Sequence, residues 1–318
     1  MFTFNIPGAK SFIALTLGVA LLAVPSRGNA ASQIPLPAPG TASQIARAVA
    51  AAPSIHRLPS AASRSLLQIK RDNIANTSLG SGCTFACEWG KSSKRLVVLF
   101  GDSHAYMWSP AVARAVLAGG GRLKLMWTVG CPVAKIHVYG TYSNPNIYNK
   151  ACDDWRKQSL DQIRALHPSL VLLSERTAKL YSAPNTLFPD SSFRQGLTTT
   201  LRDLKAAGIN VMMISDNPTY ANFLDPTACM QMHPSDIQQC AVPTSQPDPQ
   251  WRFRGAAERS VAKAVGVDVI DPIKWLCVKS ACPPVIDNKA VYLDWSHITA
   301  TYSAYLSKVI GQAIQGRY

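Results

Sequence analysis

The chain has 318 residues, enough for one large domain or two small ones with a substantial hydrophobic core. Its composition, 47% hydrophobic and 16% charged, excludes a disordered chain and a protein with many membrane spans. The net charge of +14 comes from scattered Lys and Arg residues without a nucleic-acid-binding motif, so we expect no nucleic-acid partner. Such a basic surface suits contact with anionic polymers and equally suits simple solubility.

The first thirty residues have the three parts of a signal peptide. Lys10 supplies a positive charge, residues 11–24 form an apolar run, and Ala30 ends a small-residue cleavage site. The apolar run is shorter than the roughly 20 residues that span a bilayer, which favours cleavage over an uncleaved N-terminal anchor. Either outcome predicts an exported protein, periplasmic or extracellular and associated with the cell envelope.

Residues 31–65 are rich in Ala, Pro and Ser, and we predict a tether or a loosely packed extension there, with a short helix at "QIARAVAAA". From residue 66 to residue 318 the composition is that of one folded domain. No internal repeat is present in the sequence.

Within that domain, short apolar runs alternate with helical patterns. Strands are predicted over 95–101, 122–130, 169–175, 209–215 and 267–272. Apolar runs of this kind favour strands buried on both faces, and their alternation with helices predicts a parallel sheet with right-handed crossovers. We therefore expect a three-layer α/β/α fold of flavodoxin-like type, with a central parallel sheet of about five strands.

Eight cysteines, an even number, agree with an oxidising compartment. They fall into four neighbouring pairs, which is the connectivity we predict among many that eight cysteines allow: Cys83–Cys87, Cys131–Cys152, Cys229–Cys240 and Cys277–Cys282. Zinc binding is the alternative, because two of these spacings resemble ligand pairs. Since only His233 lies near a cysteine pair, we favour disulfides and predict no metal site.

Two motifs carry candidate chemistry. The first predicted strand ends at "GDSH", which places Ser103 at the edge where ligands bind in parallel sheets. Near the C-terminus, "DWSH" separates Asp294 and His297 by three residues, which on a helical turn would put both side chains on one face. The carboxylate would then orient the imidazole, leaving its other nitrogen to accept the serine proton.

Both motifs resemble the first and last blocks of the SGNH (GDSL-like) hydrolase superfamily. The surrounding sequence is similar to the SGNH domains fused to bacterial acyltransferase-3 membrane proteins. The similar segments are "LFGDSHAYMWSPAV", "TVGCPVA", "KACDDWR", "DPIKWLC", "CPPV" and "VYLDWSHIT". The resemblance extends over roughly residues 45–315 and includes "GSGCTFACEWG". The membrane acyltransferase module is missing from this sequence, so the chain resembles a stand-alone SGNH domain.

The resemblance implies a role for each matching residue. Ser103 would be the nucleophile, His297 the general base and Asp294 the residue that orients the base. The oxyanion hole would use the backbone N–H of Ser103 and of Gly130. The family asparagine after the third strand is missing from "LLSERTAKL", where Arg176 is the candidate donor instead.

Other polar residues near Ser103 have two interpretations. His104 is a candidate substrate-binding residue, although a partly buried structural histidine is the role we favour. We interpret Asp102 as a hydrogen-bond acceptor that stabilises the turn, rather than as a catalytic acid. The aromatic residues of "HVYGTYSNPNIYNKACDDW" suit stacking on sugar rings or ordinary packing.

These features predict an exported enzyme that removes or transfers O-acyl groups, acetyl groups in the first place, on a cell-envelope glycan through an acyl-serine. It would need no cofactor, and a separate membrane protein could supply the acyl group. A Gly-x-Ser-x-Gly α/β-hydrolase is disfavoured because "GDSHA" lacks the second glycine. The alternative from another class is a non-catalytic envelope protein that binds an anionic polymer on the same scaffold.

Overall fold

The structure is a computed structural model, and it describes residues 33–58, 66–80, 86–91, 93–140, 144, 146–220, 224–245 and 249–318. Residues Gln33–Tyr318 form one compact unit. The predicted signal peptide over 1–30 and the Cys83 partner in the first predicted disulfide lie outside the described residues. Among the helices of the described ranges, none combines the length and apolar composition that crossing a membrane requires.

A six-stranded sheet, in the order β1-β3-β2-β4-β7-β9, is the centre of this unit. Its strands are β1 (Ala86–Trp89), β2 (Leu96–Gly101), β3 (Arg122–Trp127), β4 (Leu170–Ser174), β7 (Val211–Ile214) and β9 (Asp268–Ile270). Five strands are parallel and match the five predicted apolar runs. The sixth, β1, pairs antiparallel with β3 at one edge and was not predicted.

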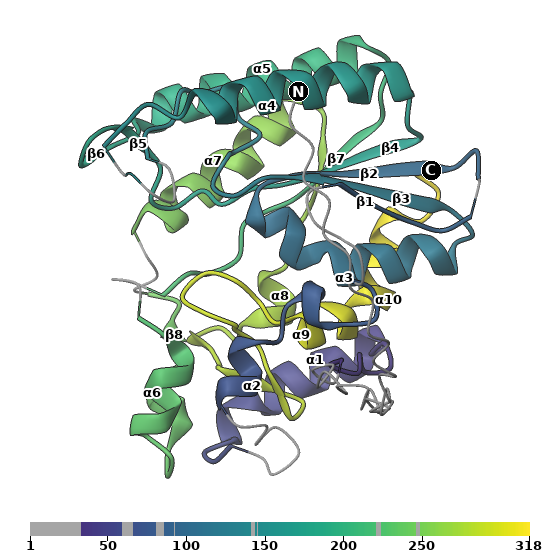
Figure 1. Cartoon of the computed structure of the whole chain (residues 1–318). Helices are drawn as coiled ribbons and strands as arrows, with labels where there is room; N and C mark the ends of the chain where they lie inside the picture. Colours follow the sequence, from purple (N-terminus) through teal and green to yellow (C-terminus); the bar gives the residue numbers. More distant parts are fainter. Residues whose placement is uncertain are drawn as a thin grey trace, which may run out of the picture. The chain divides into compact units, whose positions relative to one another are not determined.

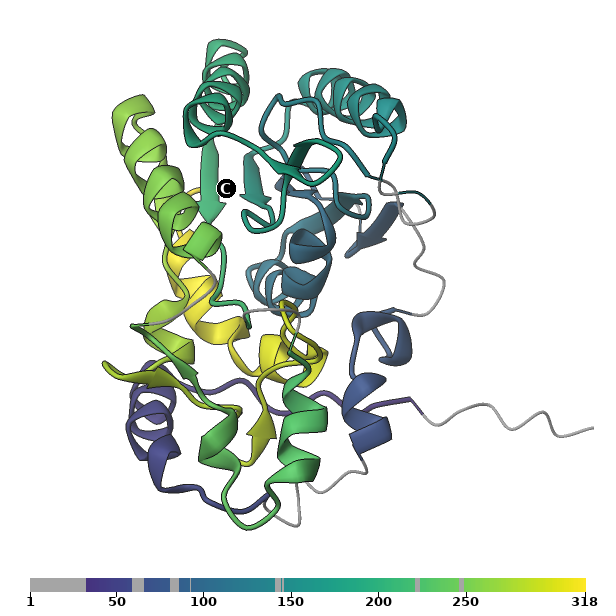
Figure 2. The same ribbon diagram turned by 90° about the vertical axis from the view of Figure 1, so that its left-hand side faces the viewer.

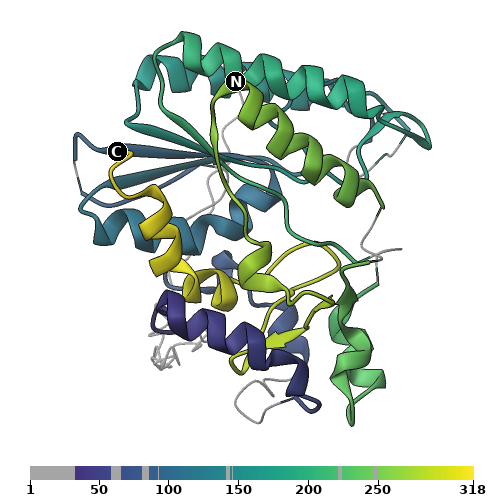
Figure 3. The ribbon, with the colours of Figure 1, turned by 180° about the vertical axis from the view of Figure 1, so that it is seen from behind.

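Helices cover both faces of the sheet, as the α/β/α prediction requires (Figures 1 and 3). One face carries α4 (Lys150–Leu166), α5 (Asp190–Ala206) and α7 (Pro249–Val265). The other carries α3 (Ser103–Ala118), α9 (Ala300–Tyr305) and α10 (Ser307–Ile314). Each face therefore has its own hydrophobic core.

The side chains of β2 show this division directly. Val98 and Phe100 pack in the core beneath α4, α5 and α7, whereas Val97 and Leu99 pack in the core beneath α3 and α10. All four side chains are fully buried, so the strand has no polar face. This explains why a continuous apolar run, rather than an alternating one, marks the strand in the sequence.

The expected tether is wrong for residues 33–58. The helix α1 (Ala42–Ala51) inserts Ile45 and Val49 into the core shared with α3, and it contacts α8 (Ile273–Leu276). Gly40 donates its backbone N–H to the carbonyl of Tyr305 at 2.9 Å. This segment belongs to the domain because its amphipathic helix buries an apolar face, a pattern that the Ala/Pro/Ser-rich composition obscured.

A third, small core lies at the bottom of Figure 2, below the main sheet. It joins α2 (Leu66–Lys70), α6 (Pro226–Met232) and the 3₁₀ turn Ile237–Cys240. Further short elements are the 3₁₀ turns Ala52–Ser54 and Ile74–Asn76 and three two-stranded antiparallel sheets: β5 (Tyr181–Ala183) with β6 (Thr186–Leu187), β8 (Val242–Pro243) with β10 (Ala281–Cys282), and β11 (Val285–Ile286) with β12 (Lys289–Ala290).

Candidate active site

Ser103 begins α3, two residues after the carboxyl end of β2. Gly101 is required there, since a Cβ atom would lie 1.7 Å from the carbonyl oxygen of Ser174. Asp102 caps the helix by accepting the backbone N–H of His104 at 2.8 Å, as its interpretation as a turn acceptor predicts. As the first residue of α3, Ser103 has a backbone N–H with no acceptor in its own helix.

Asp294 and His297 lie in a bend ahead of α9, not on the helical turn that their spacing suggested. One carboxylate oxygen of Asp294 accepts the backbone N–H groups of Ser296 and His297, both at 2.8 Å. This local turn brings the two side chains together as a helical turn would have done. The Asp294 carboxylate lies 2.8 Å from Nδ1 of His297.

Ser103, His297 and Asp294 form one hydrogen-bonded chain. Nε2 of His297 is 2.8 Å from the Oγ of Ser103. Burial pushes the pKa of Asp294 up, but its hydrogen bonds with His297 and with two backbone N–H groups outweigh this and lower the pKa to about 2. An ionised carboxylate only accepts, so the proton of the imidazole lies on Nδ1 and leaves Nε2 to accept from Ser103.

The hydrogen-bonded side chains of Ser103, His297 and Asp294 line a cavity of about 900 Å³. Its walls are rich in aromatic side chains, and Tyr106 stacks on Trp127 with ring centroids 4.1 Å apart. Tyr139, Tyr181 and Trp295 also line it. The cavity thus combines a reactive hydroxyl with flat apolar surfaces beside it.

The three residues expected in the oxyanion hole, Ser103, Gly130 and Arg176, all line the same cavity. Gly130 has φ +64°, a conformation that favours glycine. The backbone N–H of Arg176 donates to Asp102 at 3.0 Å, which leaves the guanidinium to act as a donor. That guanidinium lies 5.5 Å from the ring centroid of Trp295, and its buried Nε has no hydrogen-bond partner among the described residues.

His104 does not line the cavity, and we correct its expected role in substrate binding. Its side chain is fully buried, and its Nδ1 lies 2.7 Å from a carboxylate oxygen of Asp216. Burial pushes the pKa of His104 down, but the charge and hydrogen bond of Asp216 outweigh it and raise the pKa overall. The structural interpretation of His104 is the one that the structure favours.

Buried carboxylates that the sequence motifs did not indicate lie near the candidate active site. Glu175, Asp216 and Glu258 are all fully buried. Burial raises the pKa of Glu175 to about 8, and the charge of Asp102 adds to this effect. The available signal was positional, because Glu175 and Asp216 follow strand ends just as Ser103 does.

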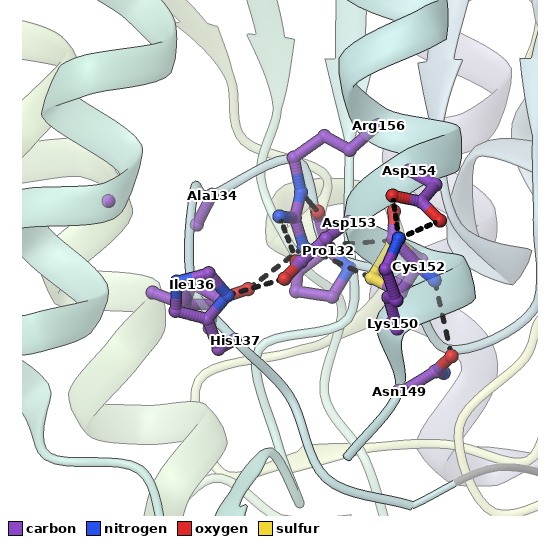
Figure 4. Close-up of polar contacts among 12 residues, drawn as sticks. Pro132, Ala134, Ile136, His137, Asn149, Lys150, Cys152, Asp153, Asp154 and Arg156 are labelled. Carbon is purple, nitrogen blue, oxygen red and sulfur yellow. Dashed lines mark hydrogen bonds and ion pairs between the residues drawn. A yellow bond between two sulfur atoms is a disulfide. The ribbon is translucent and has the colours of Figure 1, made fainter.

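Disulfides join Cys131 to Cys152, Cys229 to Cys240 and Cys277 to Cys282, which are the pairs expected from proximity in the sequence. The first of them holds the segment after Gly130 against α4. Arg156 reinforces this attachment from α4, since its guanidinium donates to the carbonyls of Pro132 at 2.9 Å and Ile136 at 3.0 Å (Figure 4). The cavity wall is therefore fastened covalently and by a buried cation.

A parallel α/β/α sheet, with a serine after its first parallel strand and Asp-x-x-His before its last helices, defines the SGNH class of hydrolase folds. The model of one family, described as "SGNH domain (fused to AT3 domains)", matches residues 69–312. The chain therefore belongs to that family. A comparison with curated proteins finds no match.

Solved structures are similar to this chain at low sequence identity. The periplasmic domain of a lipopolysaccharide acetyltransferase from Salmonella ser. Paratyphi A is 17% identical with a TM-score of 0.57, covering 80% of this chain and 99% of that domain. A GDSL-like lipase from Bacteroides thetaiotaomicron is 15% identical with a TM-score of 0.45, covering 80% of this chain and 100% of the lipase. A carbohydrate acetylesterase from Sinorhizobium meliloti is 11% identical with a TM-score of 0.44, covering 70% of this chain and 100% of the esterase.

Proposed function

We propose that the protein is an exported serine enzyme that removes or transfers O-acyl groups, acetyl groups in the first place, on a cell-envelope glycan. The observation that carries the proposal is the chain Ser103–His297–Asp294, with contacts of 2.8 Å at each step, opening into an aromatic cavity. A serine hydroxyl needs such a base, and the base needs such an orienting group, to act as a nucleophile.

The first half-reaction is common to an esterase and a transferase. Oγ of Ser103 attacks the ester carbonyl and passes its proton to Nε2 of His297. The tetrahedral oxyanion is stabilised by the backbone N–H of Ser103 and Gly130, with the guanidinium of Arg176 as a third donor. When the intermediate collapses, the bond to the sugar oxygen breaks, and His297 returns the proton to that oxygen.

The second half-reaction decides between the two activities. His297 deprotonates either water or a glycan hydroxyl, which attacks the acyl group on Ser103 and restores the serine. Water yields a free carboxylic acid, whereas a hydroxyl yields a new ester. A transferase would draw its acyl group from a separate membrane protein, as the fusion of this family to AT3 domains suggests.

The aromatic lining of the cavity supports a glycan substrate. Tyr106 and Trp127 present a stacked pair beside Ser103, and aromatic faces are suited to the apolar faces of sugar rings. The Salmonella domain of similar fold is named for acetyl transfer to lipopolysaccharide. Three disulfides within the domain support export, because disulfides persist in oxidising compartments.

The test uses purified protein, an aryl acetate and a Ser103→Ala control. Ester cleavage that depends on Ser103 is expected, and a soluble glycan is then added as acceptor. Acetyl groups on the glycan would establish a transferase, and free acetate alone would establish an esterase. Equal inactivity of both proteins across several esters would contradict the proposal and favour the polymer-binding alternative.

A further inference from the structure

Two adjacent residues after β7, Asp216 and Asn217, contact both halves of the candidate active site. Both side chains are fully buried, and neither lines the cavity. Ser103 and His297 lie 194 residues apart, on opposite sides of this pair in the sequence. The pair is therefore placed to set the position of one half against the other.

Asp216 holds the half that contains the nucleophile. One carboxylate oxygen lies 2.7 Å from Nδ1 of His104, the residue after Ser103. The other accepts the backbone N–H of Thr177 at 2.8 Å and its hydroxyl at 2.9 Å. The backbone N–H of Asp216 in turn donates to Glu258 at 3.0 Å. Asp216 thus fixes the start of α3 to the ends of β4 and β7.

Asn217 holds the half that contains the base. Its Nδ2 donates to the carbonyl of Ser296 at 2.9 Å, the residue immediately before His297, and to the carbonyl of Pro218 at 3.1 Å. Because both partners are carbonyl oxygens, the amide nitrogen must face them. Three residues further, the backbone N–H of Tyr220 donates to the carbonyl of Trp295 at 2.7 Å. The bend that carries Asp294 and His297 is therefore held at two successive carbonyls.

We propose that Asp216 and Asn217 are positioning residues that together set the contact between Oγ of Ser103 and Nε2 of His297. This inference rests on the proposed function, because it assigns these residues a role in activating Ser103. They touch neither the cavity nor the reacting atoms, and act through His104 and Ser296. Small displacements of a nucleophile from its base lower the reaction rate strongly. Hydrogen bonds that fix this distance from outside the cavity therefore have a measurable effect on turnover.

The charges around His104 agree with a fixed pair of Asp216 and His104. The groups that face it are Asp216, Asp102, Arg176 and the ring of His297, whose centroid lies 5.0 Å away. Burial lowers the pKa of His104, Asp216 and Asp102 raise it, and Arg176 lowers it. The 2.7 Å contact between Nδ1 of His104 and Asp216 is the attachment on which the proposal rests.

The experiment measures kcat and KM for aryl acetate hydrolysis by the whole protein and four variants. Asn217→Ala and His104→Leu each remove one attachment, and we expect kcat to fall roughly 10- to 100-fold with KM nearly unchanged. His104→Asn keeps an N–H donor toward Asp216 and should restore most of the loss. Tyr220→Phe is the matched control, because it removes a buried bond of 2.8 Å to the carbonyl of Cys240 from the same loop and keeps the backbone bond.

The same proteins are treated with a fluorophosphonate, which phosphonylates an activated serine with loss of fluoride. The rate at Ser103 should fall in the same order as kcat. Equal losses in Tyr220→Phe and Asn217→Ala, measured well below their unfolding temperatures, would overturn the proposal. So would failure of His104→Asn to exceed His104→Leu, since the imidazole itself would then be required.

Failure of the proposed function has a different signature. Wild-type protein that reacts with the fluorophosphonate at Ser103 but cleaves no ester would contradict acyl chemistry, while the order of phosphonylation rates would still decide the positioning proposal. Wild-type protein that does not react at Ser103 would overturn both.

Discussion

Glu175 is a carboxyl group that the fold holds in its neutral form. It is fully buried, and Oε2 accepts the backbone N–H of Ala134 at 3.1 Å, whereas Oε1 has no hydrogen-bond partner among the described residues. Burial raises its pKa to about 8. Between pH 4.5 and 8 the folded protein therefore keeps a proton that the unfolded chain releases, so this group costs stability as the pH rises.

The isosteric change Glu175→Gln removes this titration. The quantity to compare is the free energy of unfolding of Glu175→Gln minus that of wild type. We expect this difference to be about 3 kcal/mol more favourable to the variant at pH 7 than at pH 4.5, since each pKa unit corresponds to about 1.4 kcal/mol. Urea unfolding at several pH values measures this. Glu88→Gln, at an exposed edge, is the control and should show little such gain. A difference between Glu175→Gln and wild type that does not change with pH would contradict the expectation.

Arg176 lines the cavity beside Ser103, and it is the residue that we predict to act in place of an asparagine donor. If its guanidinium meets the developing oxyanion, Arg176→Met should lower kcat about 10²- to 10³-fold and change KM little. Steady-state kinetics with an aryl acetate separate the two constants. Arg194→Met, on the surface of α5, should leave both unchanged. A raised KM with an unchanged kcat would instead assign Arg176 to substrate binding.

At the scale of single residues, the sequence predicted what lies in a contiguous motif. Ser103, Asp294 and His297 were predicted to act together because "GDSH" and "DWSH" are each short and chemically distinctive, and the structure brings the three side chains into contact. Asp216 was missed because its partners, His104 and Thr177, come from other strand ends. The role of His104 stayed open for the same reason, since only the fold reveals that its ring faces a buried carboxylate.

At the scale of elements, the segment from Gly130 to Ile136 depends on α4. Arg156 is 4% exposed, and it donates to two carbonyls of that segment and to Asp153 at 2.8 Å. Arg156→Met should destabilise the protein by about 3 to 5 kcal/mol, because it leaves buried partners unpaired. Lys157→Met, one residue along on the exposed face, should change the stability by less than about 0.5 kcal/mol.

Denaturant unfolding of the two variants makes this comparison. Similar stabilities for Arg156→Met and Lys157→Met would show that the disulfide from Cys131 to Cys152 suffices to hold the segment. The polar contacts in Figure 4 would then contribute nothing measurable.

The strand β1 shows why one element escaped prediction. It is four residues long, "ACEW", and pairs only with β3 at the edge of the sheet. Short edge strands have one paired side and tolerate polar residues, and β1 lacks the continuous apolar run that marked the five parallel strands. In this strand, Glu88 accepts a hydrogen bond of 2.6 Å from Lys124 of β3.

At the scale of the whole molecule, the parallel sheet and its two helical layers followed from the alternation of apolar runs and helices. The N-terminal boundary of the domain could not be predicted in this way. An Ala-rich segment has the composition of a linker whether or not its helix has a buried face. The faces of α1 differ, since Ile45 is fully buried and Arg47 is exposed. Only the packing partner, which comes from α8 some 230 residues later, reveals the difference.

Substitutions in α1 test whether this segment stabilises the domain. Ile45→Ala should cost about 2 to 5 kcal/mol, the usual range for a buried Ile. Arg47→Ala, on the opposite face of the same helix, should be nearly neutral. Thermal or denaturant unfolding of the full chain measures both, and a neutral Ile45→Ala would mean that residues 33–58 form a tether after all.

The separation of Ser103 and His297 has a consequence in time. At roughly 5 to 20 residues per second, a ribosome makes the serine about 10 to 40 seconds before its base. During that interval the growing chain carries an ordinary hydroxyl, chemically inert toward esters. Ser103 becomes reactive only when the C-terminal bend is in place and α9 and α10 pack into the core. Each incomplete chain therefore lacks activity toward esters.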